Sequence, residues 1–398
     1  MKVLMFGWEF PPFNSGGLGV ACRGLVKHIS QYSDLTLILP QTPQNMQLDC
    51  DFLNINLQTK NTLTQDIEFA PYKSSKINRE LSSTYKEDKV FYGKDIYQKV
   101  QIYTQQAEKF IRSEDFDVIH VHDWLTIPAG LKAKEMTDKP VVVHVHATEY
   151  DRTAGHGVND FVYNKEREGF SQADKVLTVS NRTKEIINEK YETDEDKIEV
   201  VHNSIDQNRA VNSKDELEQL QEEHDIVLFV GRITLQKYPS GFIKAAERVS
   251  QQKDDILFLM AGSGDMKENV MELAAECGIA DKVLFPGFVQ GEELSKLYNS
   301  ADVFIMPSVS EPFGLTALEA LSHGTPTLVS KQSGVSEVVD HALRADFWDI
   351  DDMASKILSV LQYDALKEQL SDYGRREARN MSWSRPSQKC VNIYKQLV

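Results

Sequence analysis

The sequence predicts an α/β protein with two Rossmann-like domains, each built on a doubly wound parallel sheet. Short apolar runs of strand length alternate with longer segments of helical period, as they do in parallel sheets with helical crossovers. The alternation starts twice, first with the apolar residues 2–7 and again with residues 226–231. The very acidic residues 215–225, just before the second start, indicate a linker or a solvated helix.

The composition is that of a soluble globular protein. The 398 residues include 41% hydrophobic and 26% charged side chains, which is enough chain for large cores in two or three domains. The net charge is −16 and no block of Lys and Arg occurs. We therefore expect neither nucleic-acid binding nor stable membrane association.

The first residues and the cysteines predict a cytoplasmic protein. The apolar run at the start is too short for a signal peptide, and no run near the roughly 18 apolar residues of a membrane span occurs. The four cysteines are scattered, without a C-x-x-C pair. This usage fits a reducing compartment and argues against a structural zinc site.

The opening residues predict a βαβ unit. A buried strand, a loop with prolines and glycines, a helix and a second strand are expected at residues 2–7, 8–19, 20–30 and 35–39. A dinucleotide-binding G-x-G-x-x-G fingerprint is excluded, because Cys22 holds its third glycine position. The plainer interpretation of Gly16 and Gly17 is a glycine hinge that packs the helix against the strand.

The rest of the chain continues the alternation. Residues 174–181 predict a strand that turns into a helix capped by Ser180 or Asn181. Other expected strands are at 197–202, 256–261, 282–285, 303–306 and 327–330, and other expected helices are at 96–112, at 291–300 and near the C-terminus through Leu397. Residues 41–94 are polar and weakly periodic, with a strand-like piece at 52–57, and receive no confident assignment.

Two histidine pairs lie in strands predicted at residues 117–124 and 140–152. His120 and His122 form one pair, His144 and His146 the other, and residues two apart point to the same side of a strand. Paired H-x-H is one pattern of metal ligands, which supports a metal-dependent hydrolase as a rival function. Satisfied histidines of core strands are the plainer alternative.

The stretch 308–330 predicts a loop, a helix and a strand around two carboxylates. The helix over 314–322 is too densely apolar for a surface helix, and Gly324 ends it in the left-handed conformation. Glu311 precedes the helix and Glu319 lies within it. The free N–H groups at the helix start form an anion site, where the helix dipole is positive. Two solvated glutamates in an ordinary strand–helix–strand unit are the alternative.

Two cations follow the strand that opens the second series. Arg232 and Lys237 lie five residues apart, just beyond the strand end. There a planar guanidinium and a compact ammonium can converge on one diphosphate. Two solvated cations are the alternative.

These motifs together resemble those of the retaining glycosyltransferases of the GT-B fold, namely glycosyltransferase family 4 and the glycogen and starch synthases. E-P-F-G-L with a second Glu is similar to their E-x7-E signature, and G-G-L, H-x-H-D-W, H-A-T-x-x-x-R and G-R-x-x-x-x-K are similar to further family motifs in the same order. The resemblance covers nearly the whole chain. It implies two Rossmann-like domains facing across a cleft, with an acceptor-side domain over 1–205, a nucleotide-sugar-binding domain over 206–380, and a helix over 381–398 that crosses back to the first domain.

The resemblance implies a role for each matching residue. His146, Asp123 and Glu311 are the expected catalytic residues, because their counterparts lie at the transferred sugar. Glu319 is expected to bind the ribose of the donor. The other expected phosphate- and nucleotide-binding residues are Gly16, Gly17, Arg232, Lys237, Gly314, Leu315 and Thr316.

The same resemblance implies transfer of a hexosyl unit, expected to be glucosyl, from a nucleoside diphosphate sugar to an α-glucan, as in the glycogen synthases. ADP-glucose and UDP-glucose are the expected donors, although Asn14 stands where these synthases carry a Lys that touches the donor phosphates. No cofactor and no metal ion are implied. The main alternative is a family 4 transferase acting on another polysaccharide, a disaccharide or a glycolipid. A non-catalytic nucleotide-sugar sensor is a further one.

Overall fold

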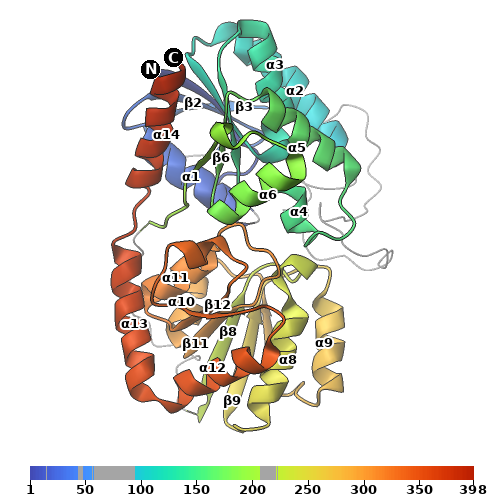
Figure 1. The fold of residues 1–398 in the computed structure, drawn as a ribbon, viewed down its shortest axis with the longest axis vertical. Helices are drawn as coiled ribbons and strands as arrows, with labels where there is room; N and C mark the ends of the chain where they lie inside the picture. Colours follow the sequence, from blue (N-terminus) through green and yellow to red (C-terminus); the bar gives the residue numbers. More distant parts are fainter. Residues whose placement is uncertain (15, 44–47, 56, 58–94, 207–220, 222) are drawn as a thin grey trace. The chain divides into compact units, whose positions relative to one another are not determined.

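The computed structural model describes residues 1–14, 16–43, 48–55, 57, 95–206, 221 and 223–398. They form two compact units (Figure 1): unit 1 comprises Met1–Asn203 with Trp383–Val398, and unit 2 comprises Ser204–Ser382. Most of the polar region 41–94 and the first part of the acidic stretch 215–225 lie outside the described residues, so the linker prediction is not addressed there.

Unit 1 contains a parallel sheet of seven strands in the order β3-β2-β1-β4-β5-β6-β7. The strands are β1 (Lys2–Phe6), β2 (Asp34–Leu39), β3 (Asp51–Asn54), β4 (Val118–His122), β5 (Val141–Val145), β6 (Lys175–Thr178) and β7 (Ile198–Val200). The order reverses between β1 and β4, where open α/β sheets place their ligands, beyond the carboxyl ends of the strands.

Helices cover both faces of this sheet (Figure 1): α1 and α14 lie on one side, and α2, α3 and α5 on the other. The helices of unit 1 are α1 (Gly17–Ile29), α2 (Ile96–Ser113), α3 (Asp123–Thr137), α4 (Glu149–Arg152), α5 (Asp160–Gln172), α6 (Asn181–Tyr191) and α14 (Ser384–Leu397). The last helix docks on the first because Gly24 has no side chain: a Cβ there would lie 2.2 Å from the ring of Trp383.

Unit 2 contains a parallel sheet of six strands in the order β10-β9-β8-β11-β12-β13. Its strands are β8 (Asp225–Val230), β9 (Ile256–Ala261), β10 (Val283–Gly287), β11 (Val303–Met306), β12 (Thr327–Ser330) and β13 (Leu343–Ala345), and its helices are α8 (Pro239–Ser250), α9 (Lys267–Glu276), α10 (Gly291–Ser300), α11 (Leu315–His323), α12 (Ile350–Gln362) and α13 (Asp364–Arg379). The order again reverses at the centre, between β8 and β11. The prediction of two doubly wound, Rossmann-like sheets is therefore confirmed.

Three details of the sequence prediction were wrong. The strand over 140–152 ends at Val145, because Thr148 and Asp151 cap a short helix: each accepts a hydrogen bond from the other's backbone N–H. The strand over 117–124 ends at His122, and α3 starts at once. The helix expected at residue 20 begins at Gly17. Residues 343–379, left without elements, form β13, α12 and α13.

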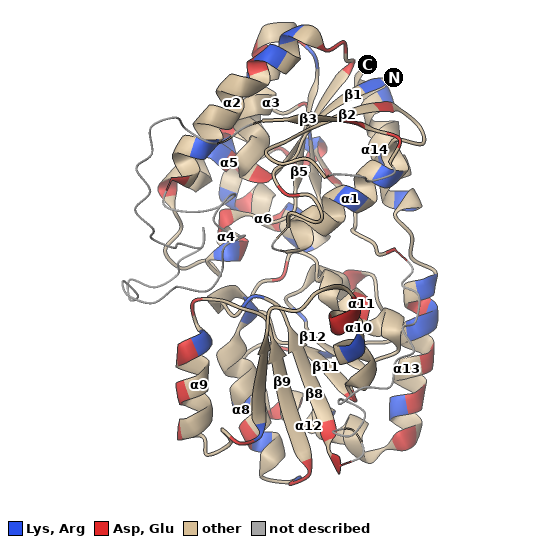
Figure 2. Ribbon diagram, turned by 180° about the vertical axis from the view of Figure 1, so that it is seen from behind, with Lys and Arg blue, Asp and Glu red and all other residues tan. Residues whose placement is uncertain are grey.

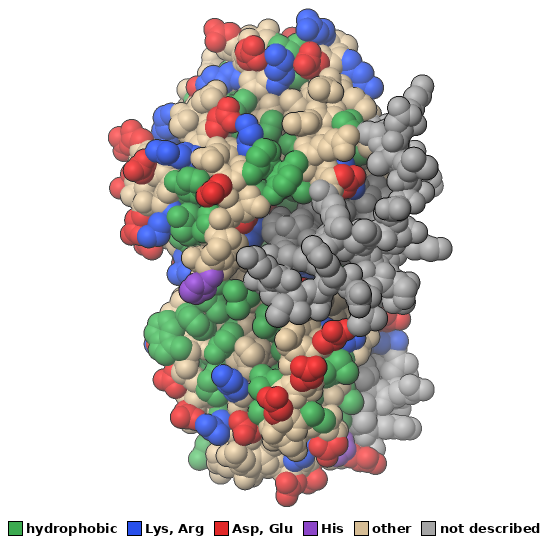
Figure 3. All heavy atoms as spheres, turned by 90° about the vertical axis from the view of Figure 1, so that its right-hand side faces the viewer, with side chains coloured by type: hydrophobic (Ala, Val, Ile, Leu, Met, Phe, Trp, Pro, Cys, Tyr) green, Lys and Arg blue, Asp and Glu red, His purple; other side chains and the backbone are tan. Residues whose placement is uncertain are grey.

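Acidic and basic residues both occur along α13 (Figure 2), and they lie interspersed on the face of the molecule shown in Figure 3. Within the part of the chain that the structure describes, no helix combines the length and apolar character needed to cross a membrane.

Candidate active site

In unit 2, the loop after β11 holds Glu311 by its backbone. The Glu311 N–H donates to the Gln332 carbonyl at 3.0 Å, and the Glu311 carbonyl accepts from the Gly334 N–H at 2.9 Å. The acidic loop is thereby tied to the segment that follows β12. Because both segments leave neighbouring parallel strands at the same edge, the Glu311 side chain lies at the carboxyl end of the sheet.

The Glu311 carboxylate forms an ion pair with Lys237 and accepts a hydrogen bond from the Ser308 hydroxyl at 3.2 Å. Glu311 is only 6% exposed to solvent. The pairing joins residues that the sequence analysis assigned to different roles, one to the sugar and one to the diphosphate. It also gives the buried carboxylate a cation, which burial of a charge requires.

Arg232 lies at the same edge, just beyond β8. Its Nη2 donates to the side-chain oxygen of Gln236 at 3.3 Å, and the carbonyl of Gln236 accepts from Val309 N–H at 2.9 Å. Gln236 thus links the loop of the two cations to the loop of Glu311. The sequence alone did not indicate Gln236 or Ser308, since their role depends on contacts between distant loops.

The loop after β8 lies directly against the glycines that follow β9. A Cβ on Gly262 would lie 1.9 Å from the carbonyl oxygen of Gly231, and one on Gly264 would lie 2.2 Å from that of Ile233. Only glycine permits this close approach of two backbones. The glycines therefore keep the Arg232 loop in place.

The start of α11 has the backbone geometry of an anion site. Gly314 caps the helix with φ of +111°, a conformation that favours glycine, and its missing Cβ leaves room for the side chain of Met306. Leu315 and Thr316 open the helix, whose first N–H groups have no acceptor within the helix. The helix ends at the left-handed Gly324, which confirms that prediction.

Glu319 is half-buried in α11 and accepts a hydrogen bond from the hydroxyl of Tyr298 at 2.9 Å. Burial raises the pKa of Glu319 to about 7, and the Tyr298 hydrogen bond opposes the rise only in part. Nothing in the sequence pattern identified Tyr298 as its partner. A carboxylate kept here against its desolvation penalty is typical of a binding group.

The raised pKa leads to a prediction about stability. Because the folded state holds the proton up to about pH 7 and the unfolded state releases it near 4.5, ionised Glu319 destabilises the fold progressively from pH 4.5 to 7 and fully above 7. We expect Glu319→Gln to raise the free energy of unfolding by about 1–3 kcal/mol at pH 8 and by less at pH 5. Thermal unfolding at both pH values measures this, with the exposed Glu368→Gln as control. An equal change at both pH values would contradict the assignment.

In unit 1, Asp123 lies where β4 ends and α3 begins. It adopts φ of +57°, which Asp tolerates better than most side chains. Its carboxylate accepts from the backbone N–H of His146 at 2.6 Å and of Ala147 at 3.4 Å, and Arg152 lies 3.5 Å from its second oxygen. Burial raises the pKa of Asp123, while Arg152 and the two N–H groups lower it. The carboxylate therefore holds the His146 backbone.

His146 follows β5 and is 9% exposed. Its Nε2 lies 2.9 Å from Nδ1 of His122, and burial lowers the pKa of His146 to about 3. The imidazole is therefore neutral at physiological pH. The structure confirms that Asp123 and His146 both follow strand ends, on the neighbouring strands β4 and β5.

Arg152 is the centre of a buried charge cluster next to the loop of His146, formed with Asp123, Glu149 and Glu166. Its guanidinium donates to Glu166 at 2.8 Å and to the carbonyl of Ala147 at 2.6 Å, and it lies 3.8 Å from Glu149. Glu166 also accepts from the hydroxyl of Tyr191 at 2.5 Å, and burial raises its pKa to about 7. Through the bond from Arg152 to Ala147, the cluster holds the loop that carries His146.

The residues of this cluster were not among the site residues expected from the sequence. Arg152 ends the H-A-T-x-x-x-R motif, so its position carried a signal. Glu166 falls on the buried face of α5, four residues before Phe170 and four after Val162. A carboxylate at an apolar position of an amphipathic helix marks a buried ion pair, and that signal was available.

Gly16 and Gly17 lie at the start of α1 in unit 1. Gly16 precedes the helix in extended conformation, and a Cβ there would meet no atom of the described residues within 4 Å. The N-terminus of this 13-residue helix offers free N–H groups, as a phosphate contact requires. The carbonyl of Gly16 accepts from the side chain of Asn14 at 3.3 Å.

Comparisons with known proteins agree with this geometry. The family model described as "Glycosyl transferases group 1" matches residues 212–377, and that of "Glycosyltransferase Family 4" matches residues 85–209. An uncharacterized glycosyltransferase of Methanocaldococcus jannaschii is 30% identical over 99% of this chain and 98% of its own length. The chain is a family 4 glycosyltransferase of the GT-B fold. A glycogen synthase of Mycobacterium tuberculosis is 24% identical to this glycosyltransferase over 99% of the chain and 94% of that protein.

Solved structures of similar fold cover the whole glycosyltransferase. The sucrose-phosphate synthase of Thermosynechococcus elongatus matches with a TM-score of 0.80 and 18% identity, over 100% of this chain and 98% of that one. Anabaena HepE, solved in complex with UDP and glucose, matches with a TM-score of 0.73 and 15% identity, over 100% of both chains. At these identities the likeness shows the fold.

Proposed function

We propose that this enzyme transfers a hexosyl unit, specifically glucosyl, from a nucleoside diphosphate sugar to an α-glucan with retention at the anomeric carbon. We assign donor binding to unit 2 and acceptor binding to unit 1. The observation that carries the proposal is the grouping in unit 2 of Lys237 with Glu311, next to the loop of Arg232 and before the N-terminus of α11. This edge of the sheet offers positive charge for a diphosphate and a carboxylate for the sugar.

Departure of the diphosphate is the step in which negative charge develops. Arg232, Lys237 and the start of α11 would stabilise that charge electrostatically. Without a donor, Lys237 neutralises Glu311. A bound diphosphate would compete for the ammonium group, so that Glu311 becomes available to the sugar as the bond to the diphosphate breaks.

On the acceptor side, we assign His146 to the transferred sugar. Asp123 acts through it, because the carboxylate accepts hydrogen bonds from the backbone of His146 and Ala147. Arg152 donates to the carbonyl of Ala147 in the same loop, and Glu166 pairs with Arg152. The loop of His146 is thus held by hydrogen bonds to the buried side chains of Asp123 and Arg152, as precise positioning requires.

The glucan acceptor is supported by the H-D-W and H-A-T-x-x-x-R motifs and by the glycogen synthase relative, which spans nearly the whole chain. Other relatives include D-inositol 3-phosphate glycosyltransferases and a mannosylfructose-phosphate synthase, which match about three quarters of the chain. A small phosphorylated acceptor is therefore the second candidate. The metal-dependent hydrolase is not supported, because the chain belongs to a transferase family. We propose a cytoplasmic location.

One experiment tests donor and acceptor together. The enzyme is incubated with ADP-glucose, UDP-glucose or GDP-mannose, each with and without glycogen, and nucleotide release and product linkage are followed. We expect release with a glucosyl donor only when glycogen is present, with α-1,4-linked glucose added. Glu311→Gln serves as the inactive control. If only another donor–acceptor pair reacts, the glucan assignment is wrong and the family assignment remains.

We expect transfer to need no added divalent metal, because two cations and a helix N-terminus already provide positive charge for the diphosphate. Added Mg²⁺ or Mn²⁺ should leave the initial rate unchanged, and so should a brief treatment with EDTA. Initial rates with freshly desalted enzyme measure this. A rate that is lost in EDTA and restored by Mg²⁺ would contradict the prediction.

A further inference from the structure

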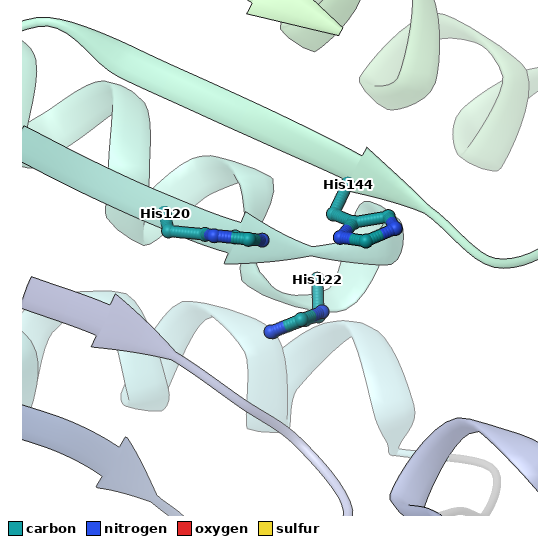
Figure 4. A group of neighbouring side chains, drawn as sticks. All are labelled: His120, His122 and His144. Atoms are coloured by element: carbon teal, nitrogen blue, oxygen red, sulfur yellow. The ribbon is translucent and has the colours of Figure 1, made fainter. Parts of the chain in front are cut away.

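Four histidines form a row on one face of the unit 1 sheet, on the side covered by α1 and α14. His122 and His144 lie directly opposite each other on β4 and β5. His120 lies two residues before His122 on β4, and His146 lies two residues after His144, just beyond the end of β5. We call these four residues the histidine row. His120, His122 and His144 are fully buried, and Figure 4 shows their rings close to one another along β4 and β5.

Most ring nitrogens of the row have no hydrogen-bond partner within the described part of the chain. These buried atoms are Nε2 of His120, Nε2 of His122, both nitrogens of His144 and Nδ1 of His146. A neutral imidazole has one donor and one acceptor, and leaving either unpaired in a protein interior is costly. So many unpaired nitrogens in one place call for a bound species.

The paired nitrogens are those that hold a metal-binding histidine in position. Nδ1 of His120 is hydrogen-bonded to the hydroxyl of Tyr394 on α14, and Nδ1 of His122 lies 2.9 Å from Nε2 of His146. In both rings the opposite nitrogen, Nε2, is the unpaired one. Metal-ligating histidines show this arrangement, with one nitrogen on the ion and the other on a hydrogen-bond partner.

The spacing and chemistry of the nitrogens fit a transition-metal ion. One nitrogen from each of His120, His122 and His144 lies within 4.8 Å of the other two. Four-coordinate zinc, with Zn–N bonds of about 2.0–2.1 Å, needs nitrogens about 3.3 Å apart. The three rings are stacked at interplanar angles of 25–28°, so binding requires them to rotate until one nitrogen of each points at the ion. Imidazole without carboxylate suits zinc, nickel or copper and not magnesium or calcium.

We propose that His120, His122 and His144 bind one transition-metal ion of the zinc class, with a water molecule as fourth ligand. The ion joins β4 to β5 beneath the loop of His146. The scattered cysteines, which argue against a thiolate zinc site, have no part in it. In addition, and resting on the proposed function, an ion on Nε2 of His122 leaves the proton on its Nδ1, which then donates to His146 and sets its tautomer.

Metal content tests the site independently of transfer. The enzyme is produced without a polyhistidine tag, desalted, and analysed by mass spectrometry for metals before and after incubation with Zn²⁺. We expect one ion per chain in the wild type and none in His144→Phe. The control variants His156→Gln and His341→Gln change exposed histidines and should keep the ion. A wild type that retains no ion after exposure to Zn²⁺, or a His144→Phe variant that retains it, overturns the proposal.

Cobalt substitution provides a second measurement on the wild type, which keeps the test decisive if His144→Phe does not fold. Chelator-treated enzyme is titrated with Co²⁺, and the visible absorption of the bound ion is recorded. We expect the intense bands of four-coordinate Co²⁺, saturating at one ion per chain and disappearing on addition of Zn²⁺. Absence of these bands overturns the proposal. If the cobalt-loaded wild type shows these bands but transfers no glucose to glycogen, the metal site stands and the proposed function is contradicted.

Discussion

Lys237→Ala and Arg232→Ala each lower kcat by about 10²–10³, the typical effect of removing one group that stabilises transition-state charge. The loss of kcat is larger for Lys237→Ala, because this change also leaves the buried Glu311 carboxylate without its cation. The variants should bind ADP or UDP more weakly while binding adenosine or uridine as the wild type does. Steady-state kinetics and calorimetry measure both quantities.

The matched control is Lys331→Ala. Lys331 belongs to the same unit and also forms an ion pair, with Asp346 at 2.8 Å, but its side chain is 53% exposed. Exposed pairs contribute little, so this variant should retain wild-type rate and affinity. If Lys237→Ala and Lys331→Ala behaved alike, Lys237 would be a structural cation and the donor site would lie elsewhere.

Glu311→Gln and His146→Ala mainly lower kcat, whereas Glu319→Gln mainly raises the KM for the donor. The proposed function assigns the first two residues to the sugar, where positive charge develops as the bond breaks, so their contacts strengthen in the transition state. A contact from Glu319 to the ribose is equal in ground and transition states and contributes to donor binding. Single-turnover rates and donor affinities of the folded variants separate the two effects.

Asp123→Asn serves as the positioning control for His146. Its amide oxygen can still accept one backbone hydrogen bond, but the charge opposite Arg152 is lost. We expect a smaller loss of kcat than in His146→Ala, with donor KM nearly unchanged. If His146→Ala and Glu311→Gln kept near-normal kcat while Glu319→Gln abolished it, our assignment of the reacting carbon would be wrong.

The sequence by itself determined the two sheets, most strands and the location of the candidate residues at strand ends. β11 and β12 coincide with the predicted strands, and α11 stops at Gly324 as expected. These features depend on local properties: hydrophobic period, strand length and glycine at a left-handed helix end. The family motifs then connected the strand ends to glycosyl transfer.

Only the tertiary structure decided which side chains meet. Lys237 and Glu311 are 74 residues apart, and Arg152 reaches Glu166 on another helix. The histidine row depends on the register that sets His122 opposite His144, and α14 docks on α1 although most of the chain separates them. Such contacts depend on strand order, register and close packing at single glycines. Local sequence does not specify these, because they arise from the simultaneous burial of distant segments.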